Sequence, residues 1–419
     1  MKRFSRSSLT TMAVCLLFIP ALLKAQPRPA HRKKVGVVLS GGGAKGMAHI
    51  GVLKVIEKAG IPIDYVVGTS MGSIIGGLYS IGYSPEQLDS MVRRQDWTFL
   101  LSDKIPRSEQ NLSERDASQK YVFSIPFGKG VKAEVFGGLI RGQNLANLFS
   151  ELTIGYHDSI NFNKLPIPFA CVSENIVNGN EVNFHEGVLA TAMRASMAIP
   201  GVFTPVRLDS MVLVDGGVVN NYPVNVARAM GADLIIGVDV QSELKPAGEL
   251  NSAGAILGQL VNLMGQDLYK KNLKETTTYI KVNVEGYSAA SFTPSAIDTL
   301  IMRGEEAAMA QDSALMALKS QLGLDSTYMP QPIPSYPYSP ERKVYVKEIT
   351  FDGLDEKDKK WLLKRCDLKE NSEISIRRIE EATAILSANL GYSGATYNLP
   401  EAPGGGYNLN YTLSKKYEN

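Results

Sequence analysis

Cysteine is too rare in this sequence to build a disulfide framework or a thiolate metal site. The 419 residues include 3 cysteines, and Cys15 lies in an apolar run close to the N-terminus. Cys171 and Cys366 fall in different predicted domains, and their spacing matches no metal-binding motif. We therefore expect two packed free thiols. Neither a metal nor a cofactor is expected for this chain.

An excess of charge of one sign is also missing. The chain has 44 basic and 42 acidic residues, which gives a formal net charge of +2. No basic stripe follows any predicted element, so nucleic-acid binding, which relies on clustered positive charge, is not expected. The apolar content of 44% and the charged content of 21% are those of an ordinary globular protein.

No stretch after residue 25 reaches the length of a transmembrane helix, so we expect a soluble or peripheral protein. The N-terminus has a basic start with Lys2, Arg3 and Arg6, then an apolar run over 12–23, and then a small residue. This layout predicts a signal peptide over residues 1–25 and therefore export, with a retained membrane anchor as the alternative.

Strand and helix patterns alternate after a short basic linker at residues 26–34. Strands are predicted at 35–39, 65–67, 167–172, 212–214, 234–238 and 279–284, and helices at 45–59, 73–81, 188–197 and 224–230. This alternation is typical of an α/β domain with a mainly parallel central sheet and helices on both faces. In such a fold, ligands bind beyond the carboxyl ends of the strands. We assign this domain to residues 35–327.

Two other segments depart from this pattern. Residues 121–125 and 131–136 flank a Pro-Phe-Gly-Lys-Gly turn, which indicates a hairpin insertion. Residues 328–342 contain five prolines and are predicted to be a linker. Beyond this linker, residues 343–415 are predicted to form a small α+β domain in the order β-α-α-β-β.

The segment Gly68–Gly72 places a serine, Ser70, between a predicted strand and a predicted helix. A serine on such a sharp turn is exposed at the end of the sheet, and the flanking glycines let strand and helix approach closely. The dipole at the start of the helix favours negative charge that develops nearby. The motif predicts a nucleophilic Ser70, with a glycine-flanked turn and a helix-capping serine as the alternative.

A second glycine-rich loop, Gly41–Gly46, also lies between a strand and a helix. Successive backbone amides at a helix start bind anions, so an oxyanion hole and a nucleotide phosphate site are both conceivable. The loop lacks the G-x-x-x-x-G-K-[ST] order, because Met47 follows Gly46. Its G-x-G-x-x-G match has no acidic residue at the end of the next strand. The oxyanion hole is therefore favoured.

Asp215 follows a predicted strand directly, and two glycines come after it. At the carboxyl end of the sheet, this carboxylate reaches the same crevice as Ser70, although an aspartate in this position is often a simple turn former. None of the 4 histidines follows a late strand, where a triad in the order Ser, Asp, His would place its base. We therefore favour a dyad in which Asp215 accepts the proton of Ser70, its basicity raised by a dry pocket.

With the glycine loop, the serine turn and the Asp-Gly-Gly motif in this order, residues 35–325 resemble the patatin-like phospholipases. The resemblance extends to Gly138–Gly142, Ala195–Pro200 and Tyr222–Pro223. It implies a patatin-like three-layer α/β sandwich. It also implies metal-independent cleavage of acyl esters in phospholipids or related lipids, with a membrane surface as the expected partner.

The resemblance also implies roles for individual residues. It makes Ser70 and Asp215 the catalytic dyad. It implies an oxyanion hole formed by the backbone amides of Gly41, Gly42, Gly43 and Ala44. Lys45 stands where family members carry Arg or Lys, and it is expected either to orient the loop or attract a phosphate, or else to be a solvated lysine. Ser196 belongs to the family pattern but lies within a helix, so we interpret it as structural.

Residues 343–415 resemble a POTRA domain, which implies a strand edge that binds a peptide or an outer-membrane protein partner. In Gram-negative bacteria, a barrel follows in this architecture, whereas the printed sequence leaves no strands for one. The expected location is therefore the periplasm or the outer membrane, or secretion, with display at the cell surface left open.

Two further alternatives stay open. A scaffold in which the POTRA-like unit recruits a partner is the competing function, and the presence of both Ser70 and Asp215 argues against it. The apolar stretch Ile256–Met264 is expected to pack as a helix, with an acyl groove or membrane contact as the other interpretations.

Overall fold

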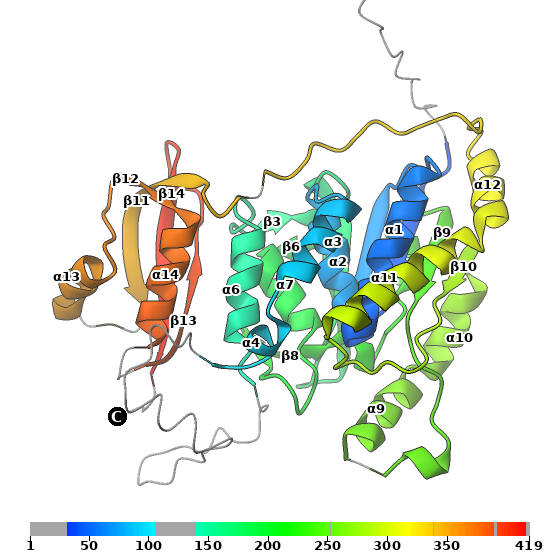
Figure 1. The fold of residues 1–419 in the computed structure, drawn as a ribbon, viewed down its shortest axis with the longest axis horizontal. Helices are drawn as coiled ribbons and strands as arrows, with labels where there is room; N and C mark the ends of the chain where they lie inside the picture. The colour runs from blue at the N-terminus through cyan, green and yellow to red at the C-terminus, as the bar shows by residue number, and fades with distance from the viewer. Residues whose placement is uncertain are drawn as a thin grey trace, which may run out of the picture. The chain divides into compact units, whose positions relative to one another are not determined.

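The computed structural model describes residues 32–104, 140–251, 253–337, 339–352, 354, 356–388 and 392–415. The predicted signal peptide, most of the predicted linker 26–34 and the predicted hairpin at 121–136 lie outside these residues. The described part of the chain is built on two larger sheets (Figure 1).

The central sheet has eight strands among the described residues, in the order β10-β9-β1-β2-β4-β8-β7, with β5 paired to β4. The strands are β1 (Val35–Leu39), β2 (Tyr65–Thr69), β4 (Phe169–Asn175), β5 (Asn180–Phe184), β7 (Val206–Leu208), β8 (Met211–Asp215), β9 (Leu234–Asp239) and β10 (Thr278–Lys281). A separate two-stranded ladder joins β3 (Ile160–Asn161) and β6 (Glu186–Gly187).

The prediction of a mainly parallel sheet is only partly right, because the sheet is mixed. Strands β10, β9, β1, β2 and β4 are parallel. Strands β5 and β8 run antiparallel to β4, and β7 runs antiparallel to β8. Short connections at 176–179 and 209–210 join these strands, and such turns can link only antiparallel neighbours.

Helices cover both faces of this sheet, as predicted. They are α1 (Ala48–Lys58), α2 (Met71–Ser80), α3 (Pro85–Arg94), α4 (Trp97–Leu100), α6 (Gln143–Leu152), α7 (Leu189–Ser196), α8 (Val224–Ala229), α9 (Ala253–Met264), α10 (Gln266–Lys274), α11 (Pro294–Met309) and α12 (Asp312–Gln321). Alternate strand residues enter different clusters: Val37 and Val66 pack in the core with α1 and α2, whereas Val38 and Val67 pack with α8. This alternation is the period of a strand buried on both sides.

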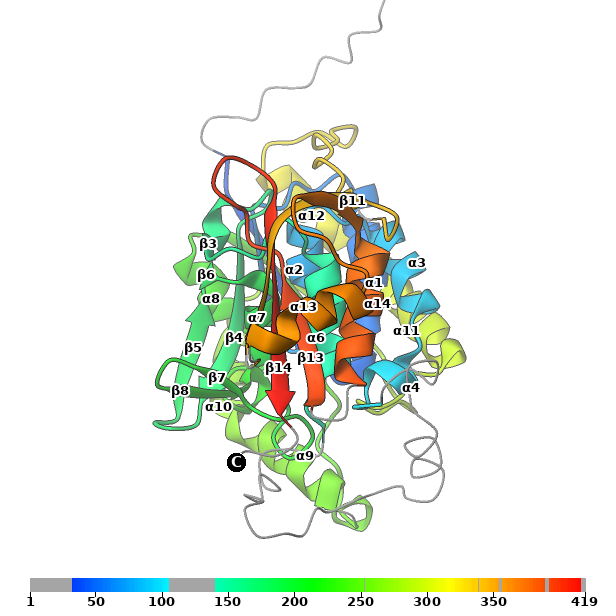
Figure 2. The ribbon, with the colours of Figure 1, turned by 90° about the vertical axis from the view of Figure 1, so that its left-hand side faces the viewer.

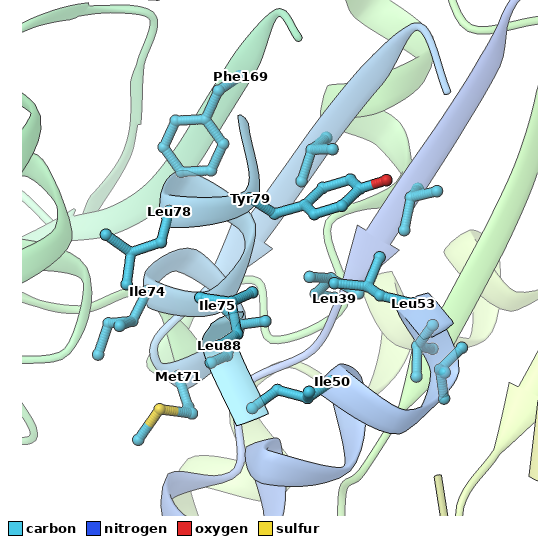
Figure 3. Packing of buried hydrophobic residues seen from close by; sticks show 14 of the residues in the cluster. Leu39, Ile50, Leu53, Met71, Ile74, Ile75, Leu78, Tyr79, Leu88 and Phe169 are labelled. Carbon is cyan, nitrogen blue, oxygen red and sulfur yellow. The ribbon is translucent and has the colours of Figure 1, made fainter. Parts of the chain in front are cut away.

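The larger core lies between β1, β4 and the helices α1, α2 and α3. Figure 3 shows Leu39, Leu53, Ile75, Leu78 and Phe169 from these elements in one cluster. Full burial of each such side chain stabilises the fold by roughly 1.5–3 kcal/mol before entropy is counted. This packing fixes the start of α2, and hence the position of Ser70.

Helices α3, α4 and α6 lie between residues 85 and 152, where no helix is predicted from the sequence. The start of α3 does carry a signal in the sequence. Ser84 accepts from the amide of Gln87, Gln87 accepts from the amide of Ser84, and Pro85 occupies the first turn. This is a capping box, and it specifies the beginning of a helix.

The C-terminal unit contains one strand more than predicted. It has β11 (Lys343–Asp352), α13 (Glu356–Arg365), β12 (Ser372–Ser375), α14 (Ile376–Ser387), β13 (Tyr392–Asn398) and β14 (Tyr407–Lys415), with the strand order β12-β11-β14-β13. Helices α13 and α14 pack on this sheet (Figure 2), with Leu362 and Ile379 in one cluster with Val346. The short β12 was missed because four residues give little periodicity.

Two predictions about apolar residues have different outcomes. Cys171 and Cys366 are buried thiols outside any disulfide bond, as expected. The expected inward packing of Ile256–Met264 is wrong for four of its side chains, because Ile256, Leu260, Leu263 and Met264 of α9 are exposed.

Among the described residues, no helix is both long and apolar enough to cross a membrane.

Candidate active site

Ser70 occupies the single residue between the end of β2 and the start of α2. Its φ of 54° and ψ of −123° are rare for a residue with a side chain. The turn is tight, because a Cβ on Gly68 would lie 2.3 Å from the carbonyl oxygen of Gly72. A Cβ on Gly72 would lie 2.2 Å from the carbonyl oxygen of Leu39. The two glycines are thus required for the geometry, as the sequence indicated.

The structure brings Ser70 and Asp215 into direct contact. Ser70 Oγ donates a hydrogen bond to Asp215 Oδ2 at 2.6 Å, and the two residues are 5% and 6% exposed. Asp215 Oδ1 accepts from the amide of Gly217 at 2.7 Å, which fixes the carboxylate. Two predicted partners 145 residues apart therefore share one hydrogen bond.

Burial changes the acid–base properties of Asp215. Desolvation raises the pKa of its carboxyl group to about 6, while the hydrogen bonds from Ser70 and from the Gly217 amide oppose that rise. A carboxylate with a pKa close to neutrality is ionised at pH 7 and is a stronger base than an ordinary aspartate.

The four predicted oxyanion-hole amides are not equivalent. The amide of Gly41 donates to Asn221 O at 3.2 Å, and that of Ala44 donates to Ala289 O at 2.9 Å. Within the described residues, no hydrogen-bond acceptor is assigned to the amides of Gly42 and Gly43. An amide that already donates to a carbonyl is not free to bind an oxyanion. Of the four predicted oxyanion-hole donors, the amides of Gly42 and Gly43 therefore remain as candidates.

Lys45 is not a solvated lysine, and that alternative is wrong. The side chain is largely buried, and its Nζ donates to Ser242 Oγ at 2.7 Å. Desolvation lowers its pKa to about 8, with Lys281 lowering it further and Asp239 opposing the change. This contact ties the glycine loop to the segment after β9, which agrees with a role in orienting the loop.

Ser196 has a closer link to the site than the sequence suggested. Its Oγ accepts from the amide of Ser70 at 3.0 Å and donates to Val172 O at 2.6 Å. It is structural in the sense that it holds the backbone of the predicted nucleophile. The backbone carbonyl oxygen of Asn221 accepts a hydrogen bond from the Gly41 amide. Asn221 is not among the predicted site residues, and its position six residues after Asp215 is the feature of the sequence that could have indicated its role.

The buried histidines have partners outside the dyad. His49 Nε2 is paired with Ser40 O at 2.8 Å, and burial lowers its pKa to about 4. His157 Nε2 is paired with Ser150 O, also at 2.8 Å. The hydrogen-bond acceptor of Ser70 Oγ is the carboxylate of Asp215 and not a histidine.

An apolar cavity of about 320 Å³ lies beside Ser70 and Gly43. Its wall comes mainly from α2, from α6 and from the segment after α7, through residues such as Ile74, Leu78, Leu145, Phe149, Met197 and Phe203. Trp97 and Phe292 stack at 4.8 Å between ring centroids in the same wall. Pockets of this size and composition hold small ligands or parts of larger ones. The helices that complete the cavity are those that the sequence did not reveal.

Comparison with known proteins supports the resemblance found in the sequence. Residues 37–228 match the family model for patatin-like phospholipases. The lysophospholipase NTE1 of Candida albicans is 31% identical over 221 residues, which cover 51% of this chain and 14% of that protein. Patatin-like phospholipase domain-containing protein 6 of Mus musculus is 32% identical over 211 residues, or 50% of this chain and 14% of that protein.

An uncharacterized NTE family protein of Mycobacterium tuberculosis is 29% identical over 230 residues, which make up 55% of each chain. The chain thus spans between about one seventh and about half of the length of these curated relatives. Among solved structures, VipD of Legionella pneumophila aligns with a TM-score of 0.40 and 16% identity, over 69% of this chain and 67% of that chain. Residues 37–228, a little under half of the chain, are therefore similar to the patatin-like phospholipases.

Proposed function

We propose that this protein is a serine lipid acyl hydrolase of the phospholipase A type, with Ser70 as nucleophile and Asp215 as general base. The observation that carries the proposal is the 2.6 Å hydrogen bond from Ser70 Oγ to Asp215 Oδ2 at the wall of an apolar cavity. The family of residues 37–228 supports lipid ester hydrolysis in general terms.

In the first step, Ser70 Oγ attacks the carbonyl carbon of the ester while Asp215 takes the hydroxyl proton. The carbonyl oxygen becomes an oxyanion, to which the amides of Gly42 and Gly43 would donate. Such preorganised donors contribute roughly 3–4 kcal/mol each to transition-state stabilisation. The ester C–O bond then breaks, and the departing alcohol, here a lysolipid, receives the proton from Asp215.

In the second step, water attacks the carbonyl carbon of the acyl-enzyme and gives a proton to Asp215. The bond between that carbon and Ser70 Oγ breaks, the fatty acid leaves, and Asp215 returns the proton to Ser70. The apolar cavity beside Ser70 would hold the acyl chain during both steps, since it offers a hydrocarbon chain a surface without competing water.

The test is the release of fatty acid from phospholipid by the purified chain in the presence of a chelator. We expect release by the unaltered protein and a loss of at least a thousandfold in Ser70→Ala and in Asp215→Asn. Asn183→Ala, an exposed site on β5, is the control and should retain full activity. Full activity in folded Ser70→Ala would contradict the proposal. An absence of fatty-acid release from all four folded proteins would also contradict it, and would favour the binding-protein alternative.

The export signal over residues 1–25 and the POTRA-like nature of residues 343–415 remain proposals from the sequence. Support for the second is limited to the presence of a four-stranded sheet with two packed helices. Cell fractionation of the full chain with and without residues 1–25 tests the first. Residence of the full chain in the cytoplasm would contradict it.

A further inference from the structure

An unusual apolar surface lies on α9. Ile256, Leu260, Leu263 and Met264 are all between 47% and 67% exposed. Their spacings of four, three and one residues place them on one face of the helix. Leu244, which is 44% exposed, precedes the helix and completes what we call the α9 surface. Single exposed apolar residues are ordinary, whereas a contiguous group marks a site of contact with a membrane or with another protein surface.

The chain before α9 keeps this surface in place, and α9 itself carries no charge. Gln259 Oε1 accepts from the amide of Lys245 at 3.0 Å, and Gln259 Nε2 donates to Lys245 O at 3.2 Å. This double contact holds the backbone of Lys245, the residue after Leu244, against the helix. The sequence from Asn251 to Gln266 contains no charged residue, although an exposed helix of a soluble protein normally carries several.

The α9 surface belongs to the end of the sheet that carries the proposed dyad. The chain enters α9 after leaving the carboxyl end of β9, and β9 pairs in parallel with β1 beside the glycine loop. Helix α9 contacts the turn Gly216–Val218, which follows Asp215 directly. Figure 1 and Figure 2 both draw α9 beyond that end of the sheet.

We propose that the α9 surface inserts into the interfacial layer of a lipid bilayer and holds the proposed active site against it. The inference rests on the proposed function, because a substrate that resides in a bilayer must be met at its surface. A helix of 12 residues is about 18 Å long, so it can lie in the interface but not span the membrane. Apolar side chains on one face are the feature that such helices use to bind.

The size of the surface favours a lipid over a second copy of the chain. A stable protein–protein interface takes about 20–30 residues on each side, whereas the α9 surface offers five apolar side chains. Shallow insertion into lipid needs no complementary partner surface. The exposed Lys270 and Lys271 of α10, which follows directly, add positive charge that suits anionic headgroups, next to the acidic Asp267.

The test measures binding to vesicles of phosphatidylcholine and phosphatidylglycerol by sedimentation, with every protein in the Ser70→Ala background so that no lipid is consumed. The test variant is Leu260→Ser with Leu263→Ser, which are 51% and 48% exposed in the native chain. The matched control is Met302→Ser with Met309→Ser on α11, at 50% and 55% exposure. We expect the partition coefficient to fall at least about tenfold in the α9 variant and to stay within twofold in the control.

The same substitutions in chains that retain Ser70 separate docking from catalysis. Hydrolysis of vesicle phospholipid should fall in the α9 variant, while hydrolysis of a water-soluble short-chain ester should stay within twofold. Unchanged vesicle binding by the α9 variant overturns the docking proposal. The proposal is also overturned if the unaltered chain forms a dimer in the absence of lipid and the α9 variant is a monomer. Absence of ester hydrolysis by the unaltered chain counts against the proposed function alone, since the sedimentation assay still judges the α9 surface.

Discussion

The pH dependence of the reaction is a direct consequence of the burial of Asp215. Desolvation raises the pKa of this carboxyl group to about 6, and the proposed mechanism requires its ionised form. With that pKa, about 9% of the molecules carry an ionised Asp215 at pH 5 and about 91% at pH 7. We therefore expect kcat/KM to rise about tenfold from pH 5 to pH 7 and to level off above pH 7. A water-soluble short-chain ester is the right substrate, since it removes any effect of pH on vesicle binding.

The expected magnitude distinguishes a buried from an ordinary carboxylate. An aspartate with the usual pKa of 3.8 would be about 94% ionised at pH 5, so its profile would be flat over this range. Circular dichroism at each pH checks that the protein remains folded. A flat profile in the folded protein, or an acid limb with its midpoint near 4, would refute the argument that desolvation tunes the base.

Three further predictions concern the same site. Because the pKa of Asp215 is raised in the folded state, the native protein loses stability as the pH rises from 3.8 to 6. Asp215→Asn removes this loss, so the variant should be inactive but more stable than the native protein in urea, by up to about 3 kcal/mol at pH 8. This gain in the free energy of unfolding should shrink as the pH falls towards 4. Ser196→Ala leaves the buried Ser70 amide without its acceptor, at a cost of about 1–3 kcal/mol, and should lower kcat more than it raises KM in steady-state assays. Gly43→Ala places a Cβ 2.5 Å from Ala289 O at a φ of +57°, so the loop must shift: ester hydrolysis should fall, and urea unfolding should show a loss of about 1–3 kcal/mol.

The parts of the site that could be read from the sequence are those fixed by local chemistry. The turn at Ser70 needs glycine on both sides, and its strand and helix have clear apolar patterns, so its conformation follows from a few neighbouring residues. The position of Asp215 at a strand end follows in the same way. The contact between these two residues was an inference from fold class, and the structure confirms it.

The remaining features depend on tertiary contacts that no local pattern encodes. Whether the amide of Ala44 is free depends on Ala289, which is distant in sequence. The role of Ser196 depends on the approach of α7 to the start of α2. The α9 residues follow the pattern of a buried helix but remain exposed, because periodicity reports where an apolar face lies and not what covers it.

The mixed character of the sheet, which the alternating pattern did not predict, explains how the dyad forms. Strand β2 pairs with the first half of β4, where Thr69 lies opposite Val172, and β8 pairs with the second half, where Asp215 lies opposite Ser173. Since β5 occupies the other edge of β4, β2 and β8 share one edge and run towards each other. Their carboxyl ends therefore meet, which places the residue after β2 against the last residue of β8. In a wholly parallel sheet, these two ends would lie side by side on separate strands. The register between β4 and β8 matters as well, because a shift of one residue would turn Asp215 to the opposite face of the sheet. The antiparallel strand is thus the element that allows a carboxylate to contact the serine directly, without a histidine between them.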